Sequence, residues 1–128
     1  RLCPLKFDKI LLDAPCSTLA KIGFENVKSP KEIKALALLQ KKLLHSALKA
    51  LKHGGELVYS TCTFLREENE EVLENALRCE FELEFLELDL EGVIAKEAKS
   101  EFKELKKARR IMPCENYDGF FIAKMRKI

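Results

Sequence analysis

The sequence predicts an α/β fold in which strands and helices alternate along a single domain of 128 residues. Three observations carry this prediction: a short apolar run at 7–13, an amphipathic helix pattern that begins near Ser29, and a second apolar run at 56–60 followed by another helix pattern. Alternating strands and helices favour a largely parallel sheet. A chain of this length buries roughly two thirds of its unfolded surface, which is enough for a hydrophobic core.

The first strand is predicted at 7–13, because a continuous apolar run is typical of a parallel strand covered on both faces. The next helix starts at Ser29-Pro30-Lys31-Glu32, which combines a Ser cap, a Pro at the first helical position and a Glu three residues after the cap. Apolar residues then recur at helical spacing as far as Leu51. The segment Lys52-His53-Gly54-Gly55 marks its end, and we expect His53 to interact with the helix dipole there.

The second half of the chain continues the alternation. A strand at 56–60 precedes a helix at 67–77, whose acidic first turn suits the positive end of the helix dipole. Alternating apolar and acidic residues at 81–88 predict a strand exposed on one face, which we expect to form an antiparallel edge with a closing strand at 119–126. Between them, the spacing at 92–108 predicts an irregular or short amphipathic helix.

Composition restricts the class of protein. Five cysteines form an odd set without a Cys-x-x-Cys pair, which fits neither a disulfide framework nor a zinc site, so we expect no metal and a reducing, cytoplasmic location. The 23 basic and 21 acidic residues leave a net charge of +2, too small to indicate a nucleic-acid partner alone. No apolar run is long enough to span a membrane, and no signal peptide opens the sequence.

Two predicted strands end in reactive side chains. The run at 10–12 leads into Asp13-Ala14-Pro15-Cys16-Ser17, and the run at 56–59 leads into Ser60-Thr61-Cys62-Thr63. Ligands bind outside the carboxyl ends of parallel strands, so both tips are expected at one pocket. A thiolate is a strong nucleophile, an Asp holds or protonates a substrate heteroatom, and a second thiol exchanges a proton. These groups suit conjugate addition, whereas Cys3, Cys79 and Cys114 are interpreted as structural.

Four segments resemble the NOL/NOP/Sun family of RNA (cytosine-5) methyltransferases: Phe7 to Ser17, Leu51 to Thr63, Glu67-Glu68-Asn69-Glu70, and Asp118 to Ala123. Their order and spacing agree with the family along nearly the whole chain. The resemblance implies a Rossmann-like class I methyltransferase sheet that uses S-adenosylmethionine, mostly parallel and flanked by helices, with an antiparallel last strand. Residues 1–128 then hold the C-terminal part of that domain, its fourth to seventh strands.

The same resemblance implies roles for individual residues. Cys62 is the nucleophile that adds to C6 of a cytosine in tRNA or rRNA, and Cys16 assists elimination. Asp13 lies beside the methyl donor and hydrogen-bonds the base near N3. Pro15 borders the cofactor and contacts the exocyclic amine, while Ser17 and Phe120 contact the substrate. The cytosine must be unstacked for C6 to be reached.

The chain also departs from the family pattern. Thr18-Leu19-Ala20 replaces the usual glycine after Ser17, Arg66 stands where Pro is common, and Cys114 stands where His often follows the Pro. The glycine-rich first turn and the acidic residue that grips the cofactor ribose have no counterpart. The sequence opens with Arg1 and enters a strand at once, so we expect a part of a longer domain, with an exposed edge on its first strand and little cofactor binding by the chain alone.

Two alternatives remain open. In a DNA-type cytosine methyltransferase, the Pro15-Cys16 tip supplies the nucleophile and Cys62 is a bystander. In a non-catalytic module, the basic stretch at 96–110 and the last strand bind RNA or a protein partner. The missing N-terminal half of the domain is itself an expected partner.

Overall fold

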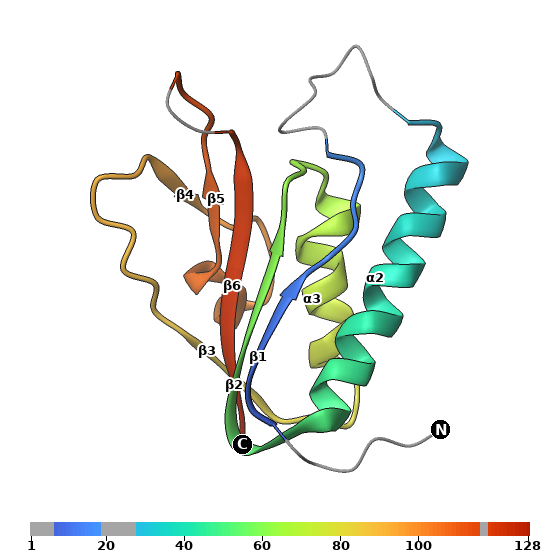
Figure 1. Cartoon of the computed structure of the whole chain (residues 1–128), viewed down its shortest axis with the longest axis vertical. Coiled ribbons are helices and arrows are strands. Elements are labelled where there is room, and N and C mark those ends of the chain that lie inside the picture. Colours follow the sequence, from blue (N-terminus) through green and yellow to red (C-terminus); the bar gives the residue numbers. More distant parts are fainter. Residues whose placement is uncertain (1–6, 19–27, 116–117) are drawn as a thin grey trace.

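The computed structural model describes residues 7–18, 28–115 and 118–128. These residues form a six-stranded sheet of order β1-β2-β6-β5-β4, with β3 also paired to β6. Helices α2 and α3 contact each other on one side of that sheet (Figure 1). The elements are β1 (Phe7–Asp13), α2 (Pro30–Ala50), β2 (Leu51–Thr61), the 3₁₀ turn η2 (Arg66–Glu68), α3 (Glu70–Leu77), β3 (Leu83–Leu86), β4 (Ala95–Glu97), the 3₁₀ turn η3 (Lys103–Lys107), β5 (Arg109–Ile111) and β6 (Phe120–Lys127).

Strand direction changes at β6. β1 and β2 are parallel, whereas β2, β3 and β5 each pair with β6 in antiparallel register. The expected α/β class and antiparallel last strand are confirmed, as is the edge that 81–88 forms with the last strand. Among the described strands only the β1–β2 pair is parallel, because β6 runs back between its neighbours and so opposes each of them.

Helix α2 begins as its sequence predicts and ends earlier. The Ser29 hydroxyl accepts a hydrogen bond from the backbone N of Glu32 at 3.2 Å. At the other end, the buried Lys127 ammonium donates to the carbonyls of Leu48 at 2.8 Å and Leu51 at 2.9 Å. These bonds satisfy helix-end carbonyls, so the helix stops at Ala50.

His53 therefore does not lie at a helix terminus. It belongs to β2, and its Nδ1 lies 3.3 Å from the Ile128 carbonyl oxygen. Its predicted interaction with the helix dipole is wrong, because residues 51–55 already run in the strand that follows α2. Near the start of β2, Gly54 has a φ of +82°, a backbone conformation that favours glycine.

Two further segments differ from expectation. The second helix starts at Glu70 and not at Glu67, because Asn69 turns back to bind β2 before the helix begins. The irregular or short helix predicted within 92–108 is present only as the 3₁₀ turn η3, and the segment also contains the strand β4, which was not predicted. β4 is three residues long and exists through its pairing with β5, a long-range contact that overrides local propensity.

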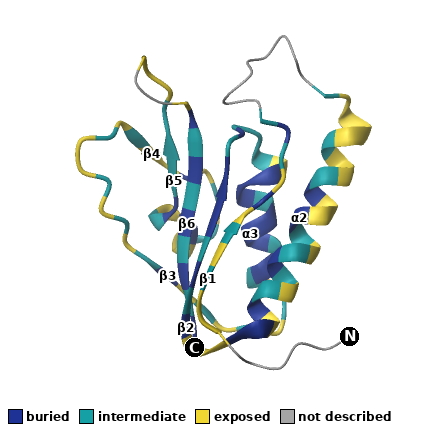
Figure 2. Cartoon of the chain, in the orientation of Figure 1, coloured by how far each residue is buried: buried dark blue, intermediate teal, exposed yellow. Residues whose placement is uncertain are grey.

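The two faces of the sheet have different surroundings. Leu57 and Tyr59 of β2 and Phe121 of β6 are buried on the face that carries α2 and α3. On the other face of β1, Leu11 is 74% exposed (Figure 2). The prediction that β1 is covered on both faces is therefore wrong for the described residues. β1 stands at the end of the strand order, so the expectation of an exposed edge on the first strand agrees with the structure. No described helix is both long and apolar enough to cross a membrane.

Candidate active site at the tips of β1 and β2

Parallel pairing brings the two predicted reactive tips side by side. Asp13 lies opposite Ser60 in the β1–β2 register, and the backbone N of Ala14 donates to the Ser60 carbonyl at 2.9 Å. The turns that follow therefore leave the sheet together. The Sγ atoms of Cys16 and Cys62 lie 3.3 Å apart, within hydrogen-bond distance for two sulfurs.

Asp13 completes this group. The Ser60 hydroxyl donates to Asp13 Oδ1 at 3.2 Å, which orients the carboxyl group at the end of β1. Asp13 and Pro15 are exposed, whereas Cys16 and Cys62 are half-buried. The structure thus brings a carboxyl group and two thiols together at the accessible C-terminal ends of β1 and β2.

The surroundings of Cys62 favour its protonated form. Burial raises the pKa of this thiol to about 12, and the hydrogen bond to Cys16 and the negative charges of Cys16 and Asp13 act in the same direction. At neutral pH Cys62 is therefore a thiol. It becomes a nucleophile only when its proton is transferred to an acceptor, and the Cys16 sulfur is the nearest one among the described hydrogen-bond partners.

The turn that carries Cys16 is held from below by Glu68. This buried carboxyl group accepts hydrogen bonds from the Ser17 backbone N at 2.8 Å and from the Ser17 hydroxyl at 2.6 Å. The Gln40 side chain of α2 donates to Glu68 Oε1 at 3.0 Å and to the Pro15 carbonyl at 2.8 Å. Pro15, Cys16 and Ser17 are thus positioned by groups from two other elements.

Ser17 faces this support and not the opening. Its side chain is fully buried, and its hydroxyl also lies 2.8 Å from Thr63 Oγ1. The hydrogen bonds of the Ser17 hydroxyl are all with this support and with Thr63, and the expected contact of Ser17 with the substrate stays a prediction. The hydroxyl joins the first tip to the second one.

Asn69 supports the turn that carries Cys62. Thr61 Oγ1 donates to Asn69 Oδ1 at 2.6 Å, and Asn69 Nδ2 donates to the Thr63 carbonyl at 2.9 Å. Both atoms of one amide therefore bracket Cys62. In the sequence, Glu68 and Asn69 stand out only as part of a family motif and of an acidic helix start. Local patterning does not predict their contacts with the two tips, nor the contact that Gln40 makes with the first tip.

The remaining predicted residues lie in different places. Phe120 is half-buried at the start of β6, and the pairing of Thr61 with Phe121 sets it at the same end of the sheet as Cys62. Cys79 donates to the Asn75 carbonyl at 3.2 Å, Cys114 is exposed, and Cys3 lies outside the described residues.

One group of potential metal ligands lies apart from the tips. It joins His45 of α2 to Cys79 and Glu80, which follow α3, with ligand atoms within 4.8 Å of one another. His45 Nε2 lies 3.3 Å from Glu80, so these two side chains already partner each other.

Comparison with known proteins identifies the family. The family model described as 16S rRNA methyltransferase RsmB/F matches residues 2–126. The chain belongs to this family. The resemblance to NOL/NOP/Sun RNA (cytosine-5) methyltransferases is thereby confirmed.

Individual relatives agree with the RsmB/F assignment. The chain is 42% identical over 130 residues to the tRNA (cytosine(49)-C(5))-methyltransferase of Pyrococcus abyssi, covering 94% of this chain and 42% of that protein. It is 37% identical to the 25S rRNA (cytosine-C(5))-methyltransferase nop2 of Schizosaccharomyces pombe, covering 95% and 22% respectively. The chain thus spans less than half the length of these relatives.

Solved structures show the same relationship. A methyltransferase homolog from Pyrococcus horikoshii superposes with a TM-score of 0.81 at 40% identity, covering 97% of this chain and 40% of that one. NSun6 from Pyrococcus horikoshii, solved with SFG, superposes with a TM-score of 0.76 at 37% identity, covering 96% and 30%. The described sheet is therefore a part of a Rossmann-like methyltransferase fold.

Proposed function

We propose that this chain supplies the reactive tips of an RNA (cytosine-5) methyltransferase in which Cys62 is the nucleophile. The observation that carries the proposal is the 3.3 Å approach of Cys16 and Cys62 beside Asp13 at adjacent strand ends. Membership of the RsmB/F family and the names of the relatives support the reaction class.

The proposed reaction begins when Cys62 passes its proton to an acceptor and its sulfur bonds to C6 of the cytosine. The C5–C6 π electrons then move toward C5 and N3, where Asp13 in its protonated form stabilises the developing negative charge by donating a hydrogen bond to N3. C5 forms a bond to the methyl group as the bond between that group and its donor breaks, and C5 afterwards loses its proton to a base, for which solvent water suffices. The electrons of that C–H bond restore the double bond and expel Cys62 as a thiolate.

Cys16 has the proton-handling role in this scheme. Its sulfur lies at hydrogen-bond distance from Cys62, so the Cys16 thiol can donate its proton to the Cys62 thiolate as that sulfur leaves C6. Removal of Cys16 should therefore slow release of the product more than formation of the adduct.

S-adenosylmethionine is the proposed methyl donor, and when bound it supplies an electrophilic methyl group. Asp13 and Pro15 fit one side of such a site, because both are exposed at the sheet edge and Ser60 orients the Asp13 carboxyl group. The Pro15 carbonyl already accepts one bond from Gln40 and keeps a second lone pair for a cytosine amine. Phe120 is proposed to border the same substrate space.

The remaining contacts to the methyl donor are proposed to come from an upstream half of the methyltransferase domain. The exposed face of Leu11 and the edge of β1 are consistent with such a neighbour. Calorimetric titration with S-adenosylmethionine should show binding only when an upstream half is mixed with the chain. Tight binding by the chain alone would contradict an incomplete cofactor pocket.

The target is proposed to be an unstacked cytosine in tRNA or rRNA, modified in the cytoplasm. The assembled protein should form a covalent adduct with RNA containing 5-fluorocytosine. Cys62→Ser should abolish this adduct, whereas Cys16→Ser should let it form and resolve slowly. The opposite pattern would identify Cys16 as the nucleophile of a DNA-type enzyme. Salt-dependent RNA binding without any adduct would identify a non-catalytic module.

A further inference from the structure

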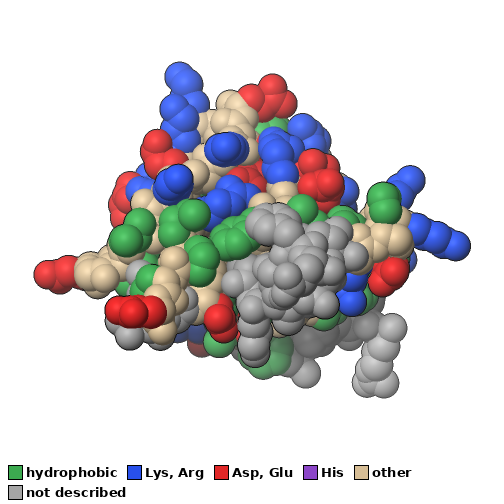
Figure 3. Space-filling model, turned by 90° about the horizontal axis from the view of Figure 1, so that it is seen from above, with side chains coloured by type: hydrophobic (Ala, Val, Ile, Leu, Met, Phe, Trp, Pro, Cys, Tyr) green, Lys and Arg blue, Asp and Glu red, His purple; other side chains and the backbone are tan. Residues whose placement is uncertain are grey.

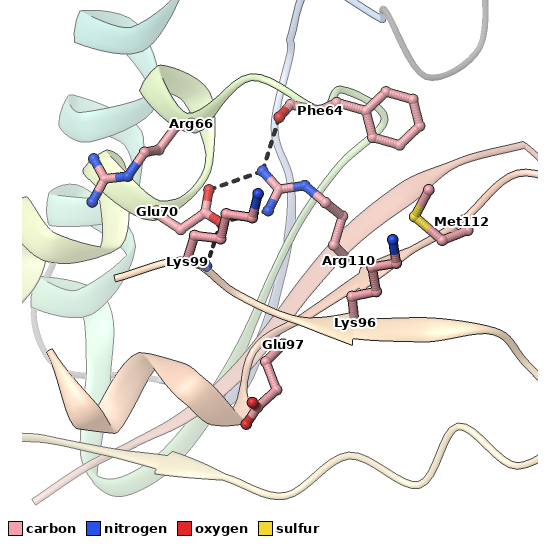
Figure 4. Close-up of a pocket in the computed structure, with 8 residues that line it drawn as sticks. All are labelled: Phe64, Arg66, Glu70, Lys96, Glu97, Lys99, Arg110 and Met112. Atoms are coloured by element: carbon pink, nitrogen blue, oxygen red, sulfur yellow. Dashed lines mark hydrogen bonds and ion pairs between the residues drawn. The ribbon is translucent and has the colours of Figure 1, made fainter. Parts of the chain in front are cut away.

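We infer that a basic cavity beside the Cys62 tip binds a backbone phosphate of the RNA next to the target cytosine. This inference rests on the proposed function and names a binding site for its substrate. The cavity has a volume of about 360 Å³ and is lined by four basic and two acidic side chains with Phe64 and Met112 (Figure 4). That volume falls within the roughly 300 to 1,000 Å³ of ordinary ligand sites.

The cavity wall is connected directly to the segment that follows the nucleophile. Phe64 is two residues after Cys62, a span of at most about 7 Å. The Arg110 guanidinium donates to the Phe64 carbonyl at 2.8 Å. A nucleotide adjoining a cytosine on Cys62 therefore reaches this wall without leaving the same end of the sheet.

A buried ion pair fixes the base of the cavity. Arg110 binds the fully buried Glu70 through two nitrogens, at 2.5 and 3.0 Å. Glu70 also accepts a hydrogen bond from the backbone N of Lys99 at 2.9 Å. Arg66 is likewise paired, with Glu71 and Glu74, so both arginines of the cavity already have acidic partners within the protein.

Lys96 and Lys99 are the basic side chains of the cavity whose positive charges remain available to a ligand. In the antiparallel β4–β5 pair, Lys96 lies opposite Arg110, so both side chains point to the same side of the sheet. Glu97 lies opposite Arg109 and points to the other side, as Figure 4 shows. Both lysines are exposed, and neither has an ion-pair partner among the side chains that the structure describes.

The arrangement fits a phosphodiester better than a small metabolite. Two exposed ammonium groups beside a fixed Arg110 match the lysine and arginine side chains that orient nucleic-acid backbones without reading their sequence. The half-buried Phe64 lies at the same rim, where aromatic rings stack on bases. Figure 3, viewed onto the end that holds the strand tips, shows Lys and Arg side chains, interspersed with Asp and Glu, beside a band of hydrophobic side chains.

The first test compares two double variants in the same basic stretch. Lys96→Ala with Lys99→Ala removes the cavity lysines, and Lys103→Ala with Lys106→Ala removes two exposed lysines outside it. Binding of a fluorescent single-stranded RNA by the 128-residue chain is measured over a range of salt concentrations. The cavity variant should bind roughly tenfold more weakly, and its slope of log affinity against log salt should fall by about 0.7 for each phosphate that the protein no longer neutralises. The control pair should show neither change.

Equal effects of the two double variants would overturn the inference, and so would an absence of RNA binding by the unmodified chain. Inorganic phosphate serves as the second probe at constant ionic strength. If phosphate binding depends on Lys96 and Lys99 while RNA binding does not, the cavity is a site for free phosphate and the RNA assignment fails.

The second test locates the bound phosphate along the RNA. RNAs containing 5-fluorocytosine carry one uncharged methylphosphonate linkage at successive positions, and adduct formation by the assembled protein is measured. A methylphosphonate at one linkage next to the target should slow adduct formation by the unmodified protein. It should not slow adduct formation any further in the Lys96→Ala, Lys99→Ala variant. Additive effects at every position would overturn the inference. If the unmodified protein forms no adduct, the proposed function fails, whereas the salt comparison still decides whether the cavity binds RNA.

Discussion

The Glu68 carboxyl group holds Ser17 by two hydrogen bonds, one from the backbone N at 2.8 Å and one from the hydroxyl at 2.6 Å. The two residues are 51 positions apart in sequence, so this interaction joins the turn after β1 to the segment after β2. Gln40 adds a bond from α2 to the same carboxyl group. The position of Cys16 is therefore set by contacts from η2 and α2 as well as by its own turn.

Removal of the Glu68 carboxyl group should destabilise the fold. In Glu68→Ala, the Ser17 amide, the Ser17 hydroxyl and the Gln40 amide lose an acceptor in a buried site. We expect the free energy of unfolding to fall by about 2 to 4 kcal/mol, since a single orphaned buried donor costs about 1 to 3 kcal/mol. Urea denaturation measures this change.

The neighbouring Glu67 provides the matched control for Glu68. It is exposed, so Glu67→Ala should change the unfolding free energy by less than about 0.5 kcal/mol. Glu68→Gln keeps one acceptor oxygen and should fall between these two values. Similar stabilities for the alanine variants at 67 and 68 would show that Glu68 does not support the turn.

The reactivity of Cys62 should depend on Cys16. Burial is the largest cause of the raised Cys62 pKa, and Cys16 contributes a hydrogen bond and a charge. Cys16→Ala removes both, so Cys62 should react faster with iodoacetamide at pH 8, by about one order of magnitude for each unit that its pKa falls. Asp13→Asn should have a smaller effect in the same direction. Peptide mass spectrometry measures the rate at Cys62, and Cys79→Ala should leave it unchanged.

The same raised pKa has a consequence for stability at high pH. The thiol releases its proton near its ordinary pKa of 9.0 in the unfolded chain but only near 12 in the folded one. Between these values the folded state binds more protons, so the contribution of Cys62 to stability falls as pH rises. In Cys62→Ala this part of the decline should disappear from unfolding curves recorded between those two pH values.

The sequence predicted the reactive group because its geometry is local. Each tip follows a strand at once, and parallel pairing of two strands suffices to bring Asp13, Cys16 and Cys62 together. The supports could not be predicted in this way. Glu68 and Gln40 reach the first tip from 51 and 25 residues away, and no periodicity encodes such distances.

The fold shows the same limit. The cap at Ser29 was predictable because its partner is Glu32, three residues on. The end of α2 was not, because it is satisfied by Lys127, 79 residues from Leu48. Likewise, β4 has too few residues for a pattern, and only its pairing with β5 makes it a strand.

Replacing Arg110 alone should destabilise the fold more than replacing Glu70 and Arg110 together. Glu70 is fully buried, so Arg110→Met leaves a carboxyl group without its partner, and we expect a loss of about 3 to 5 kcal/mol in unfolding free energy. Glu70→Gln combined with Arg110→Met should recover at least half of that loss, because the amide oxygen still accepts from Lys99. Thermal and urea unfolding of the single and double variants measure the coupling.

Arg109 is the control for Arg110, since its guanidinium donates to the backbone carbonyls of Lys106 and Ala108 rather than to a buried carboxylate. Arg109→Met should cost less than about 1 kcal/mol. A double variant at 70 and 110 that is no more stable than Arg110→Met would show that the loss comes from packing and not from an unpaired buried charge.

The exposed face of β1 should make the chain self-associate. Leu11 is 74% exposed at the sheet edge, and an uncovered apolar edge strand offers both unpaired backbone groups and hydrophobic surface to a second molecule. Leu11→Lys should reduce association in sedimentation velocity experiments over a concentration series, while changing the unfolding free energy by less than about 0.5 kcal/mol. Ile10→Lys is the contrasting variant, because Ile10 packs against the core and its replacement should unfold the chain. If Leu11→Lys associates as strongly as the unmodified chain, the exposed face of β1 is not the surface through which the molecules associate.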